Sequence, residues 1–396
     1  MSPRDVVVVG GGPAGTASAL FLRQHGHDVL LIDEARFPRD KVCGEGVSPE
    51  AWRLLGALGV APRVRALRPW PLRGMALTSP GGVSFAGHYC GPNGAGFAVR
   101  RTAFDCALLD AAREAGVEVR EGTRALDLVF DKGRVCGITC QKGKAPEALA
   151  ARLVIGADGR RSVVARRLRL LREHRSLRKF AVRGYWEGVQ GLGERGEMHV
   201  GGGGYCGIAP LSATSANVAF VLDRAGMRDA AGDLEGFYRS SLQLWPRLAE
   251  RLQKAVLFEP PKAIGPLALE ARHVSAPGAM LVGDSAGFYD PFTGEGVTLA
   301  LRSAELAAPI AHAALVSGRL DDLSGYDRLR RAATRDKFRL NRLLQTTVSW
   351  PLLADSVARR LSHRPDLADR LVGIAGDFVP ARSAWNLSFA WDLLRA

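Results

Sequence analysis

The 396-residue chain has few cysteines and no long hydrophobic run. Its six cysteines are scattered, without the paired C-x-x-C spacing of a zinc site or the density of a disulfide framework. We therefore expect no metal site and a reducing, cytoplasmic setting. No stretch of about 18 consecutive apolar residues is present to span a membrane. The N-terminus lacks the basic region, apolar core and cleavage site of a secretory signal, so no targeting segment is expected.

Acidic residues are also scarce, because 40 Asp and Glu stand against 54 Lys and Arg, for a formal net charge of +14. The excess gathers in residues 166–183, where Glu173 is the only acid. This stretch is either a solvated arginine-rich face or a docking surface for an anionic substrate, an acyl carrier protein or a membrane to which the protein binds peripherally. Nucleic acid is not an expected partner, because no recognition helix, zinc finger or aromatic stacking module accompanies the charge. The basic residues of the stretch are Arg166, Arg167, Arg169, Arg172, Arg175, Arg178, Lys179 and Arg183.

A glycine motif follows the first predicted strand. Four consecutive valines are typical of a short buried strand, and Gly10, Gly12 and Gly15 complete G-x-G-x-x-G directly after it. The first glycine allows a tight turn, the second lets the backbone approach a pyrophosphate, and the third lets a helix pack against the strand. The phosphates would meet free N–H groups where this helix begins, around Pro13 and Ala14. The motif predicts a nucleotide site.

A carboxylate that binds ribose hydroxyls is expected about 20 residues after such a motif. The second predicted strand, at 28–32, is followed by Asp33, which we take as the ribose ligand. Glu34 is the alternative, because an offset of one residue at a strand end cannot be settled from sequence.

The remaining pattern predicts a discontinuous nucleotide-binding domain with an inserted sheet. Residues 35–46 are rich in Pro, Gly and charge and should form a loop across the cofactor. Alternating strands after residue 180 predict an antiparallel substrate-binding sheet, and the tail is helical, with Trp385, Phe389 and Trp391 either docking a partner or packing in the core. Expected helices are 49–60, 102–115, 295–316 and 326–345; expected strands are 117–120, 124–130, 134–140, 153–155, 181–188, 195–200, 204–210, 216–223 and 279–284. The expected domains are 1–75, 98–178 and 265–345 for the nucleotide, 76–97 and 179–264 for the substrate, and 346–396 for the helical segment.

Three segments in this order resemble the flavoprotein superfamily of p-hydroxybenzoate hydroxylase. They are the first glycine motif with Asp33, then Gly156-Ala157-Asp158-Gly159, then the run from Gly283 to Gly296. Within that superfamily, Phe37-Pro38-Arg39-Asp40-Lys41-Val42-Cys43-Gly44 resembles the geranylgeranyl reductase-like branch, which also contains monooxygenases and is related to flavin-dependent halogenases. The resemblance implies a mixed α/β fold, with a Rossmann-like FAD-binding domain, an inserted antiparallel β-sheet substrate domain and a helical C-terminal tail.

The resemblance also implies roles for individual residues toward FAD. Asp284 would hold the ribityl chain, and the helix that begins near Gly296 would point its positive end at the flavin. Asp158 belongs to a motif that links FAD binding with access of the nicotinamide cofactor. Arg101 matches an arginine that contacts FAD near its phosphates, or it is a surface arginine before a helix. The expected FAD-binding residues are Gly10, Gly12, Pro13, Ala14, Gly15, Asp33, Glu34, Arg39, Cys43, Arg101, Asp158, Gly159, Gly283, Asp284, Pro291, Gly294 and Gly296.

Three residues are candidates for catalysis. Cys43 matches the cysteine that lies near the isoalloxazine in the reductase branch, although a cysteine can also be a small buried hydrophobic residue. Glu45 is either an acid or base of the active site or an exposed loop residue. Tyr205 is the first residue of the segment 205–210, whose sequence differs from that of the related prenyl reductases.

That departure concerns the substrate wall. Prenyl reductases carry Y-x-W-x-F-P, whereas residues 205–210 here are Tyr-Cys-Gly-Ile-Ala-Pro, so that Gly207 and Ala209 replace two bulky residues. This predicts a wider cavity for a bulky lipophilic or aromatic substrate, unless other residues refill the space. The expected substrate residues are Tyr205, Gly207, Ala209, Pro210 and Phe292.

The favoured function is that of an FAD-dependent monooxygenase. It would use NAD(P)H and O2 to hydroxylate an aromatic, polyketide-like or lipophilic secondary metabolite through a flavin C4a-hydroperoxide in a dry cavity. Only one dinucleotide fingerprint is present, so NAD(P)H would bind transiently, or a separate flavin reductase would supply electrons. The main alternative is reduction of isoprenoid double bonds. Halogenation ranks third, because the typical W-x-W-x-I-P is absent, and a flavin-binding scaffold or sensor is the non-enzymatic alternative.

Overall fold

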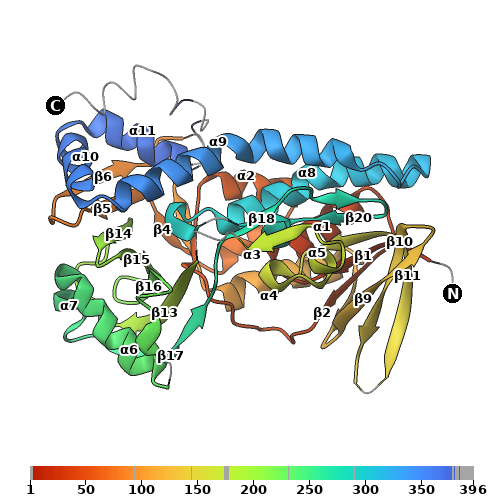
Figure 1. The fold of residues 1–396 in the computed structure, drawn as a ribbon, viewed down its shortest axis with the longest axis horizontal. Coiled ribbons are helices and arrows are strands. Elements are labelled where there is room, and N and C mark those ends of the chain that lie inside the picture. Colours follow the sequence, from red (N-terminus) through yellow and green to blue (C-terminus); the bar gives the residue numbers. More distant parts are fainter. Residues whose placement is uncertain are drawn as a thin grey trace.

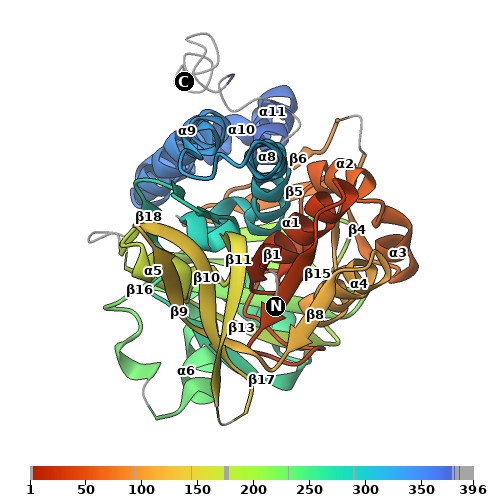
Figure 2. The same ribbon diagram turned by 90° about the vertical axis from the view of Figure 1, so that its right-hand side faces the viewer.

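Two large β-sheets with surrounding helices make up the molecule (Figure 1). The computed structural model describes residues 3–376 apart from 92–93, 144, 174–177, 231 and 289, together with residues 379 and 383. The C-terminal helices lie along one side in both ribbon views (Figures 1 and 2). They are α9 (Ser324–Val348), α10 (Pro351–His363) and α11 (Pro365–Ala375). The tail aromatics Trp385, Phe389 and Trp391 lie outside the described residues.

The first sheet has a parallel centre, as predicted for the nucleotide-binding domain. Its order is β19-β20-β11-β1-β2-β8, and the register places Val8 of β1 beside Leu31 of β2 and Ile155 of β11. Both faces of these central strands are buried, which explains their unbroken apolar sequences. The strand bounds are β1 (Arg4–Val9), β2 (Val29–Asp33), β8 (Glu118–Glu121), β11 (Pro146–Gly156), β19 (Ser275–Ala276) and β20 (Ala279–Leu281).

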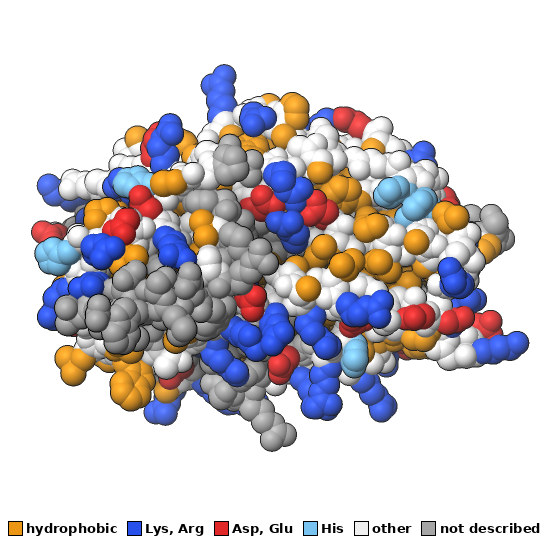
Figure 3. Space-filling model, turned by 90° about the horizontal axis from the view of Figure 1, so that it is seen from above, with side chains coloured by type: hydrophobic (Ala, Val, Ile, Leu, Met, Phe, Trp, Pro, Cys, Tyr) orange, Lys and Arg blue, Asp and Glu red, His pale blue; other side chains and the backbone are white. Residues whose placement is uncertain are grey.

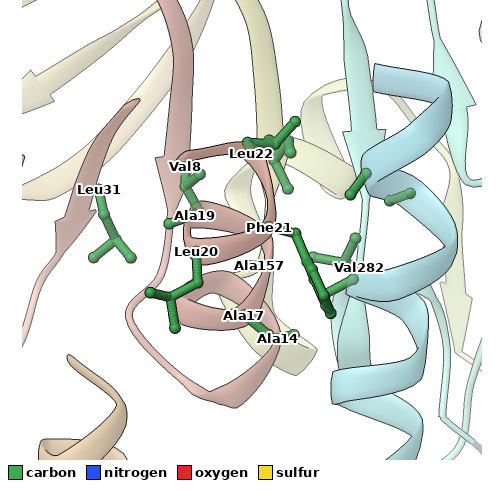
Figure 4. Close-up of a cluster of buried hydrophobic side chains, with 14 of the residues drawn as sticks. Val8, Ala14, Ala17, Ala19, Leu20, Phe21, Leu22, Leu31, Ala157 and Val282 are labelled. Atoms are coloured by element: carbon green, nitrogen blue, oxygen red, sulfur yellow. The ribbon is translucent and has the colours of Figure 1, made fainter. Parts of the chain in front are cut away.

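Helix α1 (Pro13–Gln24) packs between this sheet and α8 (Gly296–Ser317). Its inner positions carry small residues such as Ala14 and Ala17, so the helix lies close to its neighbours, and Phe21 lies beside Val282 (Figure 4). Gly15 allows the closest approach, because a Cβ there would lie 1.8 Å from the carbonyl oxygen of Gly10. The third glycine of the motif therefore does what the sequence predicts.

The strands expected over 124–130 and 134–140 are confirmed and form an antiparallel meander, whereas one predicted strand is shorter than expected. Strands β9 (Arg124–Asp131) and β10 (Arg134–Gln141) pair antiparallel with the long β11, and Figure 2 shows this ribbon at the front. We expected a core strand over 279–284, but β20 ends at Leu281 and a 3-10 helix, η4 (Gly283–Ala286), follows. Gly283 adopts φ +62°, which ends the strand. Asp284 consequently projects from a tight turn and not from a strand end.

The second sheet has the order β17-β13-β16-β15-β14-β5-β6 and is almost wholly antiparallel. Its strands are β5 (Gly74–Thr78), β6 (Ser84–His88), β13 (Lys179–Glu187), β14 (Gly196–Gly201), β15 (Gly204–Pro210), β16 (Ala216–Asp223) and β17 (Val256–Ile264). One face packs on α6 (Leu234–Ser241) and α7 (Pro246–Leu252) through an apolar cluster that includes Phe220, Tyr238 and Trp245. The opposite face meets the first domain. The exact domain boundaries stay a prediction.

Smaller elements connect the two sheets. Residues 49–60 were expected to form one helix, but α2 ends at Ala57 because Gly59 adopts φ +75°, and α3 follows. The remaining elements are α2 (Glu50–Ala57), α3 (Ala61–Ala66), α4 (Arg101–Glu114), α5 (Val163–Arg167), β3 (Gly46–Val47), β4 (Trp70–Leu72), β7 (Gly96–Ala98), β12 (Leu171–Glu173) and β18 (Leu269–Ala271). Among the described residues, α8 alone is long and apolar enough to cross a membrane, and half of its most apolar window is buried inside the protein.

Candidate functional site

The glycine turn after β1 is built to receive a pyrophosphate. Gly10 adopts φ +105°, and a Cβ there would lie 2.5 Å from the carbonyl oxygen of Ala157, so only glycine fits. Gly12 precedes α1 in an extended conformation, Pro13 opens the helix, and no side chain caps it. The first-turn N–H groups around Ala14 are therefore left for a ligand.

The carboxylate of Asp33 faces this turn. Its Oδ2 accepts a hydrogen bond of 2.7 Å from the N–H of Gly11, and its Oδ1 accepts one of 2.8 Å from Ala35. The Glu34 side chain is 72% exposed and lies 3.7 Å from Arg124. The geometry therefore favours Asp33 over Glu34 as the ribose ligand.

Two arginines beside the turn share one buried carboxylate. Arg101 donates two hydrogen bonds of 2.7 Å to Asp105, and Arg39 Nη2 lies 3.5 Å from the same carboxylate. Arg39 also covers the turn, because its Nη2 would lie 3.1 Å from a Cβ at Gly12. The alternative that Arg101 is a surface arginine is wrong, since it is only 5% exposed. Arg39 therefore lies beside the turn where the diphosphate of a dinucleotide is expected, and Arg101 is linked to it through Asp105.

The second and third motifs meet through a lysine that the sequence did not single out. Lys41 Nζ lies 3.5 Å from Asp284 Oδ2 and would lie 3.4 Å from a Cβ at Gly159. Asp158 accepts a hydrogen bond of 2.6 Å from the Val163 N–H, while its buried Oδ1 has no hydrogen-bond partner among the residues that the structure describes. Burial raises the pKa of Asp158.

The loop expected to cross the cofactor is fixed by contacts from both domains. The carbonyl of Cys43 accepts a hydrogen bond of 2.9 Å from Asn217 of β16, and its Sγ accepts one of 3.3 Å from the Glu45 N–H. Arg101 also lies next to the Cys43 thiol. Cys43 is therefore partly buried where the substrate sheet meets the FAD-binding domain.

Glu45 is buried and not an exposed loop residue. It is 1% exposed, and its Oε1 accepts hydrogen bonds from the Arg101 N–H (3.0 Å) and the Tyr185 hydroxyl. Its Oε2 has no hydrogen-bond partner among the described residues. Burial raises the pKa of Glu45, and the hydrogen bonds from Tyr185 and Arg101 oppose the shift. The positive charge of the nearby Arg183 also lowers the pKa of Glu45, but the net shift remains upward. Burial therefore makes protonation of Glu45 more favourable than in a solvent-exposed glutamate.

Tyr185 is held by charges from three elements. Its ring lies between guanidinium groups, with Arg100 at 4.3 Å and Arg183 at 4.1 Å from the ring centroid. Arg183 is fully buried and pairs with Asp40 of the cofactor loop. These positions come from β13 and from segments more than 80 residues earlier, so no spacing in the sequence could predict them.

Tyr205 lies at the other end of the same sheet face. Its hydroxyl donates to Asp290, and Phe292 packs edge-on at 5.0 Å. Lys179 Nζ lies 3.3 Å from Asp290. Burial and the Asp290 charge raise the pKa of Tyr205, so the hydroxyl stays protonated and bound. Tyr205 therefore positions the 290–293 turn and is not free to exchange protons.

Gly207 and Ala209, which replace bulky residues of prenyl reductases, have different amounts of space around them. A Cβ at Gly207 would find its nearest atom, Met198 Cε, at 3.6 Å, so this position has room. Ala209 instead packs on Leu72 and Ala98, which refill the space there. Strand alternation places Pro210 on the opposite face, with Cys206 and Ile208, which does not favour its expected contact with substrate.

The run that leads into α8 forms a second helix start without a side-chain cap. Pro291 begins a 3-10 helix, and Gly294 adopts φ +68° before α8 begins at Gly296. Glu295 between the glycines is buried and lies 3.2 Å from Lys337 of α9. Burial raises the pKa of Glu295 and lowers that of Lys337.

These residues fit FAD. Two uncapped helix starts, a glycine turn that a Cβ would fill, and the unpartnered Asp158 Oδ1 are suited to an extended dinucleotide. The family model of the FAD binding domain matches residues 4–339. The chain belongs to this family.

Relatives of this flavoprotein include two reductases. Menaquinone reductase of Mycolicibacterium smegmatis is 30% identical over 348 residues, which cover 81% of this chain and 78% of that protein. Digeranylgeranylglycerophospholipid reductase of Methanosarcina acetivorans is 31% identical over 336 residues, covering 79% and 76%. The solved structure of CmlS, a flavin-dependent halogenase, superposes with a TM-score of 0.83 at 24% identity, covering 97% of this chain and 77% of that one. The flavoprotein is an FAD-dependent oxidoreductase of the p-hydroxybenzoate hydroxylase superfamily, similar to its geranylgeranyl reductase-like branch.

Sequence reasoning missed several residues of this site. Lys41 had a usable signal, because it follows Arg39 in the cofactor loop, and Asp290 had one because it precedes a proline at a helix start. No sequence signal pointed to Tyr185, to Arg183 or to Lys337, the ion-pair partner of Glu295. Their contacts arise from elements distant in sequence.

Proposed function

We propose that this flavoprotein reduces a carbon–carbon double bond of a lipophilic substrate. The two relatives above are named reductases of menaquinone and of a digeranylgeranyl lipid, and both match most of this chain. This support places reduction ahead of hydroxylation, the reverse of the order expected from residues 205–210 alone.

One observation in the site carries the proposal: the buried carboxyl group of Glu45. Saturation of a double bond needs two electrons and two protons, so the site must deliver a proton to the second carbon. Glu45 Oε2 is buried and has no hydrogen-bond partner in the described part of the chain, and burial raises the pKa of Glu45. General acids of this kind work best when their pKa lies near the working pH.

The roles of the residues follow from their contacts. When bound, FAD supplies two electrons and one proton to the double bond. Glu45 supplies the second proton from Oε2, and the Tyr185 hydroxyl and the Arg101 N–H then stabilise the carboxylate that remains. Proton uptake from solvent restores the acid. Asn217 fixes the Cys43 carbonyl and with it the loop that carries Glu45.

Hydroxylation with NAD(P)H and O2 is the second candidate. The space at Gly207 favours it, because the wall that is bulky in prenyl reductases is open there. A bulky aromatic or polyketide-like substrate could then lie flat against β15. Halogenation stays third.

Product mass separates these functions. Purified holoenzyme would be incubated with menaquinone, geranylgeranyl lipids or aromatic polyketides, using NAD(P)H or a separate flavin reductase as electron source. We expect a gain of two hydrogens per turnover under anaerobic conditions, and much slower formation of that product by Glu45→Gln. A gain of one oxygen that requires air would instead establish hydroxylation and reject reduction. Steady NAD(P)H oxidation that a substrate stimulates would exclude the scaffold or sensor alternative.

Docking of an acyl carrier protein or a membrane through the basic stretch is also proposed, for Arg166 to Arg178 only. Lys179 and Arg183 point into the site, where they pair with Asp290 and Asp40, so the stretch is not one solvated face. Arg175 lies outside the described residues. Co-sedimentation with anionic vesicles at rising salt tests the membrane part of this proposal, and binding that is absent at low salt rejects it.

A further inference from the structure

A hollow of about 240 Å³ lies between β18 and α9, outside the residues assigned to FAD. We call it the arginine hollow. One water needs about 10–15 Å³ on this measure, so a diphosphate group fits. The hollow is lined by Leu269, Glu270, Ala271, Arg272, Val274, Ala286, Gly287, Asp327, Arg330, Arg331, Thr334, Arg335 and Phe338. Lys and Arg side chains also gather on the face of the molecule seen in Figure 3.

Three of the four arginines that line the hollow have no ion-pair partner among the described residues. Within the described part of the chain, no carboxylate lies within ion-pair distance of Arg272, Arg331 or Arg335. Arg331 and Arg335 are one helical turn apart on α9, so they project to the same side. Three mutually repelling guanidinium groups around one hollow are suited to an anion.

Two acids, Glu270 and Asp327, also line the hollow. Asp327 accepts a hydrogen bond of 2.7 Å from the Val274 N–H and another from the Ser275 hydroxyl. Glu270 lies opposite Arg172 where β18 pairs with β12. Four arginines against two carboxylates leave the lining of the hollow with a formal charge of +2.

The hollow adjoins the FAD motif. It shares Gly287, Arg330, Thr334 and Phe338 with a smaller cavity of about 40 Å³, whose lining includes Asp284, Glu295 and Gly296. Arg330 lies at the junction and donates a hydrogen bond of 3.4 Å to the Gly287 carbonyl. A phosphate group in the hollow would thus lie at the entrance to the cofactor region, whereas the FAD diphosphate belongs at the start of α1.

We propose that the arginine hollow binds the phosphate groups of a reactant that visits the flavin. Arginine forks bind phosphate oxygens in pairs, so a diphosphate would engage Arg272, Arg331 and Arg335 together. Two sources share this chemistry: the diphosphate of NAD(P)H and a diphosphate headgroup on the substrate. The inference rests on the proposed function only in requiring such a reactant, and the mass of the product tests that function separately.

Calorimetry with inorganic pyrophosphate on the FAD-loaded enzyme tests the site itself. The variant Arg331→Gln/Arg335→Gln is expected to bind pyrophosphate at least ten-fold more weakly than the wild type. The matched control, Arg224→Gln/Arg319→Gln, removes two exposed arginines that do not line the hollow and should bind as the wild type does. Equal affinity of the two double variants for pyrophosphate would overturn the proposal. So would the absence of binding by the wild type at about 10 mM pyrophosphate, a concentration on the order of the Kd of a weak anion site.

Kinetics then identify the source. If the donor binds here, Arg331→Gln/Arg335→Gln raises the KM for NAD(P)H in anaerobic flavin reduction, while reduction by dithionite is unchanged. If the substrate binds here, KM rises instead for a diphosphate substrate and not for its dephosphorylated form. Unchanged KM values for both reactants would overturn the assignment even if pyrophosphate binds.

Discussion

Gly15 shows how strictly one position can be determined by packing. Its missing Cβ lets α1 lie against the turn after β1, where even one carbon would lie 1.8 Å from the Gly10 carbonyl oxygen. Glu45 shows the opposite case, since nothing about a glutamate in a polar loop indicates that it is buried. Its chemistry depends on Tyr185 and Arg101, which reach it from other elements.

Gly15→Ala should release FAD and destabilise the fold. The added carbon forces α1 away from β1, at a cost of about 2 kcal/mol or more in unfolding free energy, as for other overpacked cores. Bound flavin absorbance and urea unfolding measure both effects. Gly56→Ala is the control, because nothing lies within 4 Å of its Cβ inside α2, and there we expect a gain of up to about 1 kcal/mol. Full flavin content in Gly15→Ala would contradict the packing argument.

Glu45→Gln should alter the pH dependence of product formation. Since burial raises the pKa of Glu45, the wild-type rate should be highest at low pH and fall as pH rises through that pKa. The stability that protonated Glu45 contributes should be lost over the same range. The variant should be slower by roughly 10²-fold or more below this pKa and lack that falling limb. Glu34→Gln, at an exposed position, should keep the wild-type dependence of rate on pH. If the rate of Glu45→Gln still falls with rising pH as in the wild type, Glu45 is not the proton donor.

At the scale of elements, β15 decides which residues face the site. Its alternation turns Tyr205, Gly207 and Ala209 toward the FAD-binding domain and Pro210 away. Tyr205 is bound by Asp290 and Ala209 is covered by Leu72, so Gly207 is the open position of this strand. Helix α9 acts on both sides, with Lys337 inside the site and Arg331 in the hollow.

Gly207→Trp should narrow the substrate range without unfolding the protein. The nearest atom to its Cβ lies 3.6 Å away and belongs to the flexible Met198, so the indole can be accommodated over the sheet. We expect KM to rise at least ten-fold for bulky substrates, which corresponds to about 1.4 kcal/mol, and to change little for slim ones. Gly207→Ala, which adds one carbon, is the matched control. Equal KM changes for bulky and slim substrates would show that Gly207 does not border the substrate.

At the scale of the whole molecule, the two domains are joined by buried charge as well as apolar contacts. Asp40 of the cofactor loop pairs with Arg183 and with Lys262 of the substrate sheet. Burial alone would raise the pKa of Asp40, but Lys262 and Arg183 lower it below its usual value. Stability from this carboxylate is therefore present above its unfolded pKa and lost as pH falls through the folded value.

Asp40→Ala should loosen the contact between the domains. It leaves the fully buried Arg183 without its main partner, and loss of one member of a buried ion pair costs about 3–5 kcal/mol. Urea unfolding monitored by flavin fluorescence and by circular dichroism measures the loss. Asp28→Ala removes a carboxylate that is 55% exposed and paired with Arg4, and should cost no more than about 1 kcal/mol. Similar losses in the two variants would contradict the role of Asp40.

The sequence by itself determined the cofactor and the architecture that holds it. The motifs from Gly10 to Asp33, at Asp158 and from Gly283 to Gly296 act through backbone shape and through side chains at strand and helix ends. These properties depend on neighbours close in the chain, so spacing reveals them. The central parallel sheet, the meander and α8 could be predicted for the same reason.

Only the tertiary structure decided the environment of the reacting groups. It buried Glu45 and Arg101, turned Arg183 inward from a basic stretch, and ended β20 before Asp284. Each outcome depends on contacts with residues far away in the chain, and burial is what changes the pKa of a carboxyl group or makes an arginine structural. Local sequence cannot encode desolvation, because the groups that exclude water come from other elements of the fold.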